Sequence, residues 1–215
     1  METKSESPII LARDNLKLHI RDMQIYRKHS FAEYLQSGWQ ISLSVAIDYT
    51  QSNGHRDHPT SLHYQQKGKP SPYERAMRAV GNVLEYYDKK RSFPVYGFGG
   101  VPSFVEEECN EWCFPLTGVD ELPEIRFIEG VIELYRHTLS LIELSGPTYL
   151  SHVLNNFLKH MRLLQGAAVY QVLLILTDGD ITDMKQTKDF ICELANFPCS
   201  IVIVGIGNAG FHKMD

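Results

Sequence analysis

Cysteine is scarce in this 215-residue chain, which contains only four cysteines and no CxxC pair. A structural zinc site needs closely spaced cysteine pairs or histidines at ligand spacing, so this pattern argues against one. We interpret the four residues as reduced thiols of an intracellular protein. The sequence also lacks an apolar run long enough to cross a membrane, and its polar N-terminus lacks the apolar core of a signal peptide. We therefore expect a cytoplasmic protein.

Basic residues are in the minority, with 21 Lys and Arg against 26 Asp and Glu and a formal net charge of −5. A dedicated nucleic-acid-binding domain normally carries a basic excess, so we expect no nucleic-acid partner. Apolar residues make up 43% of the chain and charged residues 22%. These are ordinary proportions for a globular domain with a hydrophobic core.

The motifs of several enzyme classes are also missing. The glycines at 97, 99 and 100 do not form a dinucleotide-binding fingerprint, because the third is misplaced and no helical pattern follows. The sequence has neither a G-x-S-x-G nucleophile elbow nor a phosphate-binding loop of the G-x-x-x-x-G-K-[ST] type. His55, His58 and His63 cluster in one segment, where we expect them to face solvent rather than bind a metal. We therefore expect no catalytic residues.

What the sequence does contain is an alternation of buried-strand and amphipathic-helix patterns. Strands are expected at residues 40–47, 93–98, 169–176 and 199–204, and helices at residues 72–90, 124–144, 149–164 and 183–196. Shorter elements are expected at 16–27 (strand), 29–35 (helix, capped by Ser30) and 112–114 (strand). Continuous apolar strands are buried on both faces, and strands separated by helices are usually parallel. The sequence therefore predicts an α/β fold, a doubly wound, mostly parallel sheet flanked by helices.

Oxygen-bearing side chains follow the predicted strands at the edge where such sheets bind ligands. The segment DYTQSNG begins at Asp48, Thr148 follows a Gly-Pro break, and Thr177 and Asp178 follow the strand at 169–176. Taken singly, each segment is explained by a strand end, a turn or a helix cap. Taken together, they predict a site for a cation such as Mg²⁺, which prefers oxygen ligands.

These segments also resemble a known family. D-x-T-x-S, a distant Thr and T-D-G resemble the metal-ion-dependent adhesion site of von Willebrand factor A domains, in which D-x-S-x-S is the commoner first motif. The segment ISLSVAIDYTQSNG resembles the copine version of that fold, as do YGFGG, SGPT, LILTDGDITD and SIVIVGIGNAGFHKMD in the same order. The chain is thus identified as a member of the copine family, with a flexible lead-in at 1–15 and a von Willebrand A domain, related to Rossmann-like folds, at 16–215.

The resemblance implies one Mg²⁺ or Mn²⁺ ion, with Ca²⁺ as an alternative. The implied ligands share oxygen donors and are Asp48, Thr50, Ser52, Thr148 and Asp178. The hydroxyls would bind directly, and the carboxylates partly through water. The residues implied to contact a partner lie beside these ligands and are Asn53, Gly54 and Asp180. For Asp180 a solvated loop charge is the simpler alternative, and Asp183 is expected to cap a helix.

The resemblance further implies a metal-dependent protein-interaction module of a signalling protein that binds phospholipid in a calcium-dependent way and acts in membrane trafficking. Its partners would be intracellular proteins that offer a carboxylate to the metal. The family's phospholipid binding belongs to two C2 domains, which do not fit into the first 40 residues. We therefore expect plasma-membrane recruitment only in a full-length form. The alternatives are a metal-dependent enzyme transferring phosphoryl or acyl groups at the same site, and a scaffold with a vestigial site.

The family pattern continues beyond residue 215 with another strand and a terminal helix, so the domain is expected to be truncated at its C-terminus. The predicted strand at 199–204, CSIVIV, is uncharged and has high β-propensity. Such a strand at the rim of a sheet favours association with other chains. Self-association through this strand is therefore expected.

Overall fold

The computed structural model describes residues 9–11, 16–18, 24–105, 112–120, 122–179, 181–208 and 211. The chain divides into two compact units, Met1–Gln36 and Ser37–Asp215. Residue 16 is the expected start of the domain, whereas the compact unit that carries the main sheet begins at Ser37.

The first unit contains a short antiparallel pair, β1 (Ile9–Leu11) with β2 (Leu16–Leu18), and one helix, α1 (Phe31–Gln36). The strand expected at 16–27 is therefore too long, because residues 24–30 are irregular and residues 19–23 lie outside the described part of the chain. The expected helix is confirmed. Ser30 Oγ accepts from Glu33 N at 3.3 Å, and Glu33 Oε2 accepts from Ser30 N at 2.8 Å, which is a reciprocal N-terminal cap.

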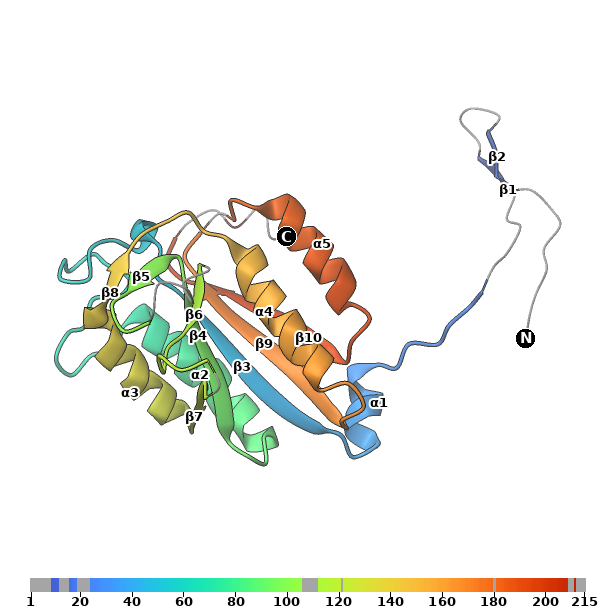
Figure 1. Cartoon of the computed structure of the whole chain (residues 1–215), viewed down its shortest axis with the longest axis horizontal. Helices are drawn as coiled ribbons and strands as arrows, with labels where there is room; N and C mark the ends of the chain where they lie inside the picture. The colour runs from blue at the N-terminus through green and yellow to red at the C-terminus, as the bar shows by residue number, and fades with distance from the viewer. Residues whose placement is uncertain are drawn as a thin grey trace. The chain divides into compact units, whose positions relative to one another are not determined.

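A mostly parallel sheet forms the centre of the second unit (Figure 1). Its strand order is β10-β9-β3-β4-β6, with β7 paired to β4 beside that path. The parallel strands are β3 (Gln40–Asp48), β4 (Ser92–Phe98), β9 (Val169–Thr177) and β10 (Cys199–Gly205), and the antiparallel ones are β6 (Cys113–Pro115) and β7 (Glu124–Arg126). The predicted fold class is confirmed.

Helices cover both faces of this sheet (Figure 1). They are α2 (Pro72–Tyr87) and α3 (Ile128–Thr138) on one face, and α4 (Leu150–Leu163) and α5 (Met184–Leu194) on the other. Leu154 and Phe157 of α4 pack in one buried cluster with Ala46 of β3 and Leu173 of β9. Ser71 caps α2 by accepting from Glu74 N at 3.2 Å, and Pro72 occupies the first turn of the helix.

The helix expected over residues 124–144 is wrong at both ends. The segment forms β7, then α3, a 3-10 turn (Leu139–Leu141) and β8 (Ile142–Leu144). β8 pairs with β5 (Gly100–Pro102), so residues with helical apolar spacing are drawn into a strand by a distant partner. Phe127, with φ 62°, separates β7 from α3. Apolar periodicity alone does not reveal such pairing.

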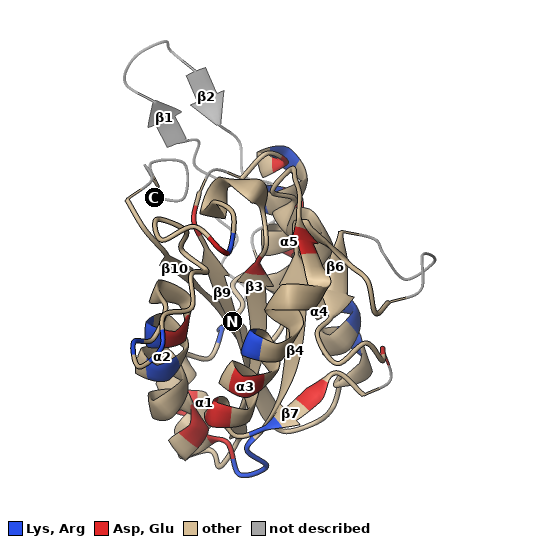
Figure 2. Cartoon of the chain, turned by 90° about the vertical axis from the view of Figure 1, so that its left-hand side faces the viewer, with Lys and Arg blue, Asp and Glu red and all other residues tan. Residues whose placement is uncertain are grey.

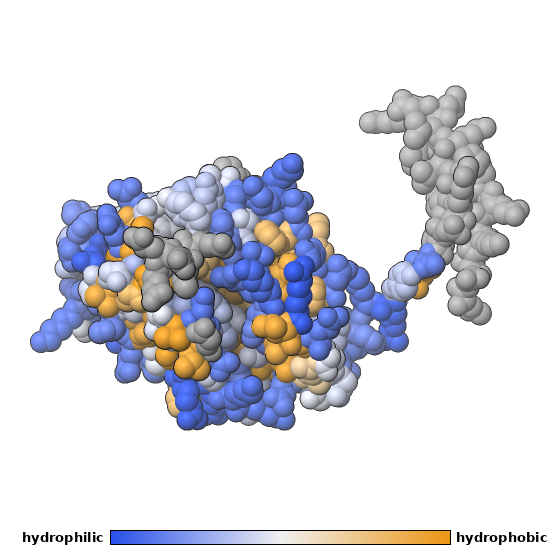
Figure 3. Space-filling view, viewed as in Figure 1, coloured by the Kyte–Doolittle hydropathy of each residue, from blue (hydrophilic) through white to orange (hydrophobic). Residues whose placement is uncertain are grey.

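The surface in Figure 3 is mainly hydrophilic, with apolar residues in small patches. Within the described residues, no helix has both the length and the apolar character needed to span a membrane.

Candidate functional site

The site lies where β3 and β9 end side by side. The two strands are parallel, with Ile47 opposite Leu176 in the register. Asp48 is the last residue of β3 and Thr177 the last of β9, so their side chains and that of Asp178 reach the same edge of the sheet. This is the edge at which open α/β sheets bind their ligands.

Five oxygen-bearing side chains meet there, and we call them the oxygen cluster: Asp48, Thr50, Ser52, Thr177 and Asp178. Thr50 Oγ1 donates to Asp48 Oδ1 at 2.6 Å and lies 2.9 Å from Ser52 Oγ. Ser52 Oγ donates to Asp178 Oδ1 at 2.9 Å, and Thr177 Oγ1 donates to Asp48 Oδ2 at 2.5 Å. Ser52 is exposed, whereas both carboxylates are buried, so the cluster opens to solvent on its Ser52 side.

Local backbone geometry brings Thr50 to the centre of the cluster. Asp48 Oδ1 accepts from Thr50 N at 2.7 Å, a turn typical of Asp, and a 3-10 turn follows at Gln51–Asn53. Gly99 packs against Thr50 with φ +74°, and a Cβ at that position would lie 2.3 Å from Thr50 Cγ2. Only glycine fits there without displacing Thr50. This role of Gly99 is not visible in the sequence.

The surroundings of the two carboxylates of the cluster disfavour their charged forms. Burial raises the pKa of Asp48, although hydrogen bonds from Thr177 and Thr50 oppose the rise. Burial, and next the negative charge of Asp48, raise the pKa of Asp178 to about 6. Within the described residues, neither carboxylate forms an ion pair with Lys or Arg. The cluster therefore has excess negative charge that a cation would neutralise.

The donor set itself is suited to a small hard cation. Within the described residues, no three His, Cys, Asp or Glu side chains converge as a metal cluster. The oxygen cluster is not a group of that type, because it combines only two carboxylates with the hydroxyl groups of Ser and Thr. Adjacent ligands of an octahedral Mg²⁺ ion with bonds of about 2.1 Å lie roughly 3 Å apart. The separations of 2.9 Å from Ser52 Oγ to Thr50 Oγ1 and to Asp178 Oδ1 are close to that value.

Thr148 is the one expected ligand whose side chain does not join the cluster in the described part of the chain. Its carbonyl oxygen accepts from Thr182 N at 3.0 Å, and the nearby Ser145 carbonyl accepts from Gln51 N at 2.6 Å. The loop that carries Thr148 is thus bonded to the segments on both sides of the cluster. This places Thr148 near the site by its backbone and leaves its half-buried side chain as a candidate ligand.

The residues expected to contact a partner are Asn53, Gly54 and Asp180. Asn53 is only 2% exposed, and its side chain donates to Thr50 O at 3.0 Å and accepts from Tyr73 Oη at 2.7 Å. Its side chain therefore holds the turn, and the expected contact of Asn53 with a partner stays a prediction. Gly54 has φ +80° and its carbonyl oxygen accepts from Ser61 Oγ at 2.8 Å, so it too shapes the loop. Asp180 lies outside the described residues.

An aromatic cluster lies behind this loop and was missed in the sequence. His63, expected to face solvent, is fully buried and stacks on Tyr73 and Tyr49, with ring centroids 4.4 and 5.4 Å away. Its Nδ1 lies 2.9 Å from Tyr135 Oη. Because Tyr73 also bonds to Asn53, this cluster is connected to the turn that positions Thr50.

The burial of His63 predicts acid lability. Burial lowers its pKa to about 3, with a smaller opposing effect from the backbone of Asp48. The unfolded chain protonates this histidine near pH 6.5, so proton uptake below that pH favours the unfolded state. The free energy of unfolding should therefore fall as the pH is lowered from 6.5, by up to roughly 1.4 kcal/mol per pH unit from this group.

The measurement is the pH dependence of chemical unfolding in the wild type and in His63→Phe, which keeps an aromatic ring. The variant should lose part of the slope below pH 6.5. His58→Phe is the matched control, since His58 is exposed in the same loop. Equal slopes in the wild type and His63→Phe would contradict the assignment.

Asp183 is confirmed as a helix cap, but the helix it caps is not its own. Its Oδ1 accepts from Leu150 N at 3.0 Å and its Oδ2 from Ser151 N at 2.9 Å. Asp183 immediately precedes α5, yet its side chain satisfies the first amides of α4. It therefore fixes the start of α4, directly after the loop that carries Thr148.

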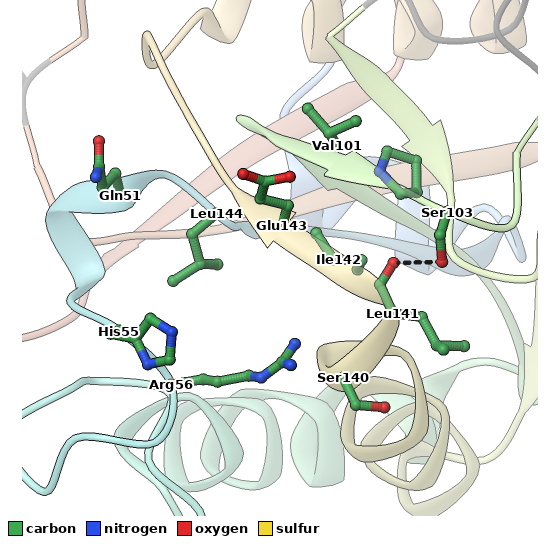
Figure 4. Close-up of a pocket in the computed structure, with 11 residues that line it drawn as sticks. Gln51, His55, Arg56, Val101, Ser103, Ser140, Leu141, Ile142, Glu143 and Leu144 are labelled. Carbon is green, nitrogen blue, oxygen red and sulfur yellow. Dashed lines mark hydrogen bonds between the residues drawn. The ribbon is translucent and has the colours of Figure 1, made fainter.

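A cavity of about 560 Å³ lies beside the turn that carries Thr50 and Ser52 (Figure 4). It lies between the β5–β8 pair and the loop that carries His55 and Arg56. Gln51, which stands between the candidate ligands Thr50 and Ser52 in the sequence, forms part of its wall. Val101 and Leu141 line it and are 47% and 38% exposed.

Comparison with known proteins agrees with the expected family and fold. The family model described as Copine matches residues 61–215. Protein BONZAI 1 and protein BONZAI 2, both from Arabidopsis thaliana, are 41% and 40% identical over 190 and 191 residues, each match covering 87% of this chain. The matched region is 32% of the length of each relative, so the chain spans about a third of these proteins.

Among solved structures, the crystal structure of manganese-loaded Plasmodium vivax TRAP protein is similar, with a TM-score of 0.51 and 13% sequence identity. The similarity covers 81% of this chain and 60% of that chain. At this identity the likeness concerns the fold alone, and it agrees with a von Willebrand A-like architecture. The family model and the two plant relatives together show that the chain belongs to the copine family.

Proposed function

We propose that this chain is a metal-dependent protein-interaction module. It would bind one Mg²⁺ or Mn²⁺ ion, with Ca²⁺ as an alternative, at Asp48, Thr50, Ser52, Thr148 and Asp178. The observation that supports this most directly is the convergence of two buried carboxylates and two hydroxyls at the ends of β3 and β9, open to solvent at Ser52.

The electrostatics favour a carboxylate as the partner's contribution. A bound divalent ion would supply the positive charge that holds an incoming carboxylate. Thr50 and Ser52 donate neutral oxygens, so two protein carboxylates are the only formal charges in the set. A partner's Asp or Glu side chain would approach from the Ser52 side, because Asp48 and Thr50 are buried.

Family membership extends this proposal to the cellular setting. We place the module in the cytoplasm, in a signalling protein of membrane trafficking that reaches the plasma membrane through C2 domains outside this sequence. Calcium-dependent phospholipid binding would belong to those domains. A metal-dependent enzyme that transfers phosphoryl or acyl groups at the same site is the alternative, since Ser52 Oγ donates to the Asp178 carboxylate there.

The test begins with Mn²⁺, the ion named for the solved TRAP structure. Wild-type protein should bind one Mn²⁺ by calorimetry, and Ser52→Ala should weaken binding by about tenfold or more, because it removes the exposed donor. Ser37→Ala is the matched control, since Ser37 is also exposed and precedes β3, whereas the oxygen cluster lies at the other end of that strand.

Partner binding is tested next by capture with Mn²⁺ or with EDTA, followed by titration of each captured protein in purified form. Binding should be saturable, sensitive to EDTA, lost in Ser52→Ala and kept in Ser37→Ala. Binding that is unaffected by EDTA would contradict the proposal. Metal-dependent turnover of a phosphate or acyl ester that Ser52→Ala abolishes would instead favour an enzyme.

A further inference from the structure

A second cavity, of about 530 Å³, lies away from the oxygen cluster, at the start of α2. We call it the basic pocket. Its wall is formed by the turn at residues 65–70 and by side chains of α2 and α3. The charged residues that line it are four cations and one carboxylate: Lys67, Lys69, Arg78, Arg136 and Glu74. This is a local excess of positive charge on a chain whose net charge is −5. Figure 2 shows Lys and Arg residues gathered around α2.

Both arginines of the basic pocket are held in fixed orientations. Arg136 Nε and Nη2 donate to the two oxygens of Glu74 at 3.0 and 2.6 Å, and Glu74 is only 2% exposed. Arg78 Nε and Nη2 donate in the same way to Glu129 at 2.9 and 2.8 Å. This side-on pairing leaves Nη1 of each guanidinium available to another acceptor. The arginines are therefore preorganised donors, and little side-chain entropy is lost when they bind an anion.

The two lysines supply the charge that is not neutralised. Lys67 and Lys69 flank Gly68 in a tight turn, closed by a bond of 3.0 Å from Lys69 N to Gln66 O. Both are exposed, and neither has an ion-pair partner in the described part of the chain. The hydrogen bond to Glu74 raises the pKa of Arg136, so its guanidinium stays charged.

We propose that the basic pocket binds the phosphate group of a small soluble phosphate ester. A phosphomonoester carries nearly two negative charges near pH 7 and several acceptor oxygens, which matches two lysines and two guanidinium edges. The cavity exceeds the size of one phosphate group, so room remains for the organic part of the ester. This site is separate from the oxygen cluster and does not depend on the proposed metal-dependent function.

The experiment titrates the full chain with inorganic phosphate and with O-phosphoserine in EDTA, which prevents binding through a metal ion. Wild-type protein should bind both saturably in the millimolar range or tighter. Lys67→Ala/Lys69→Ala should weaken binding by about tenfold, since it removes both unpaired charges. Lys185→Ala/Lys188→Ala, two exposed lysines of α5, is the matched control and should bind like the wild type. Asp48→Asn should also bind like the wild type.

Three results would overturn the inference. The first is absence of saturable binding in the wild type, or equal affinity in the Lys67→Ala/Lys69→Ala variant. The second is loss of binding in Asp48→Asn, which would move the anion to the oxygen cluster. The third is lysine-dependent binding to vesicles containing phosphoinositide in EDTA without binding of either soluble probe, which would assign the pocket to a membrane lipid. Salt should weaken the expected binding, because exposed charges are screened.

Discussion

Asp48→Asn is expected to lower the affinity for Mn²⁺ by about 100-fold or more while leaving the metal-free fold intact. The substitution removes one of two carboxylate charges from the oxygen cluster but keeps an oxygen at Oδ1. The bonds of 2.7 and 2.6 Å from Thr50 N and Thr50 Oγ1 to that oxygen can therefore persist. Metal binding should fail because the remaining carboxylate, Asp178, supplies too little charge.

The metal-free variant should be at least as stable as the wild type. Burial and the charge of Asp48 raise the pKa of Asp178, so the two carboxylates destabilise each other without a cation. Removing one charge relieves that cost. In the wild type, Mn²⁺ at 100 times its dissociation constant should raise the free energy of unfolding by about 2.7 kcal/mol. Asp48→Asn should lose this increase.

Calorimetry and thermal unfolding with and without Mn²⁺ measure both effects. Asp88→Asn is the matched control, because Asp88 is also a buried carboxylate but lies at the end of α2, far along the chain from the cluster. It should keep the response to Mn²⁺. If Asp48→Asn retains wild-type affinity for Mn²⁺, the metal assignment fails.

The sequence predicted the parts of the site that depend on strand ends. Asp48 and Asp178 follow continuous apolar segments, and parallel strands bring their carboxyl ends to one edge, so their proximity follows from topology. The four parallel strands were found for the same reason. Ser30 was recognised as a cap because its hydrogen bond is local in sequence.

What the sequence did not predict depends on contacts between distant residues. His63 is polar and lies among loop residues, but three tyrosines from separate segments enclose it. β8 is a strand only because β5 pairs with it. Gly99 resembled a strand terminator, and its contact with Thr50 appears only when β4 lies beside β3. Tertiary context overrides local preference in each case.

Asp183→Ala is expected to lower the free energy of unfolding by about 2–4 kcal/mol, because it leaves the amides of Leu150 and Ser151 without their acceptor. Asp183 is 8% exposed, so water cannot readily replace the carboxylate. The helix N-terminus also favours a negative charge at this point, and the substitution removes it. A bond of 3.2 Å from Thr187 Oγ1 to Asp183 Oδ1 is lost as well.

The variants Asp183→Ala, Asp183→Asn and Asp189→Ala separate this cap from a general effect of charge. Asparagine offers one acceptor oxygen and should lose roughly half as much stability as alanine. Asp189 lies on the exposed side of α5, and its replacement should change stability by less than about 0.5 kcal/mol. Chemical denaturation of the three variants and the wild type measures these differences.

Because Asp183 holds α4 directly after the loop of Thr148, its loss should also weaken Mn²⁺ binding if Thr148 is a ligand. A fully stable Asp183→Ala protein would show that the cap does not hold α4 in place.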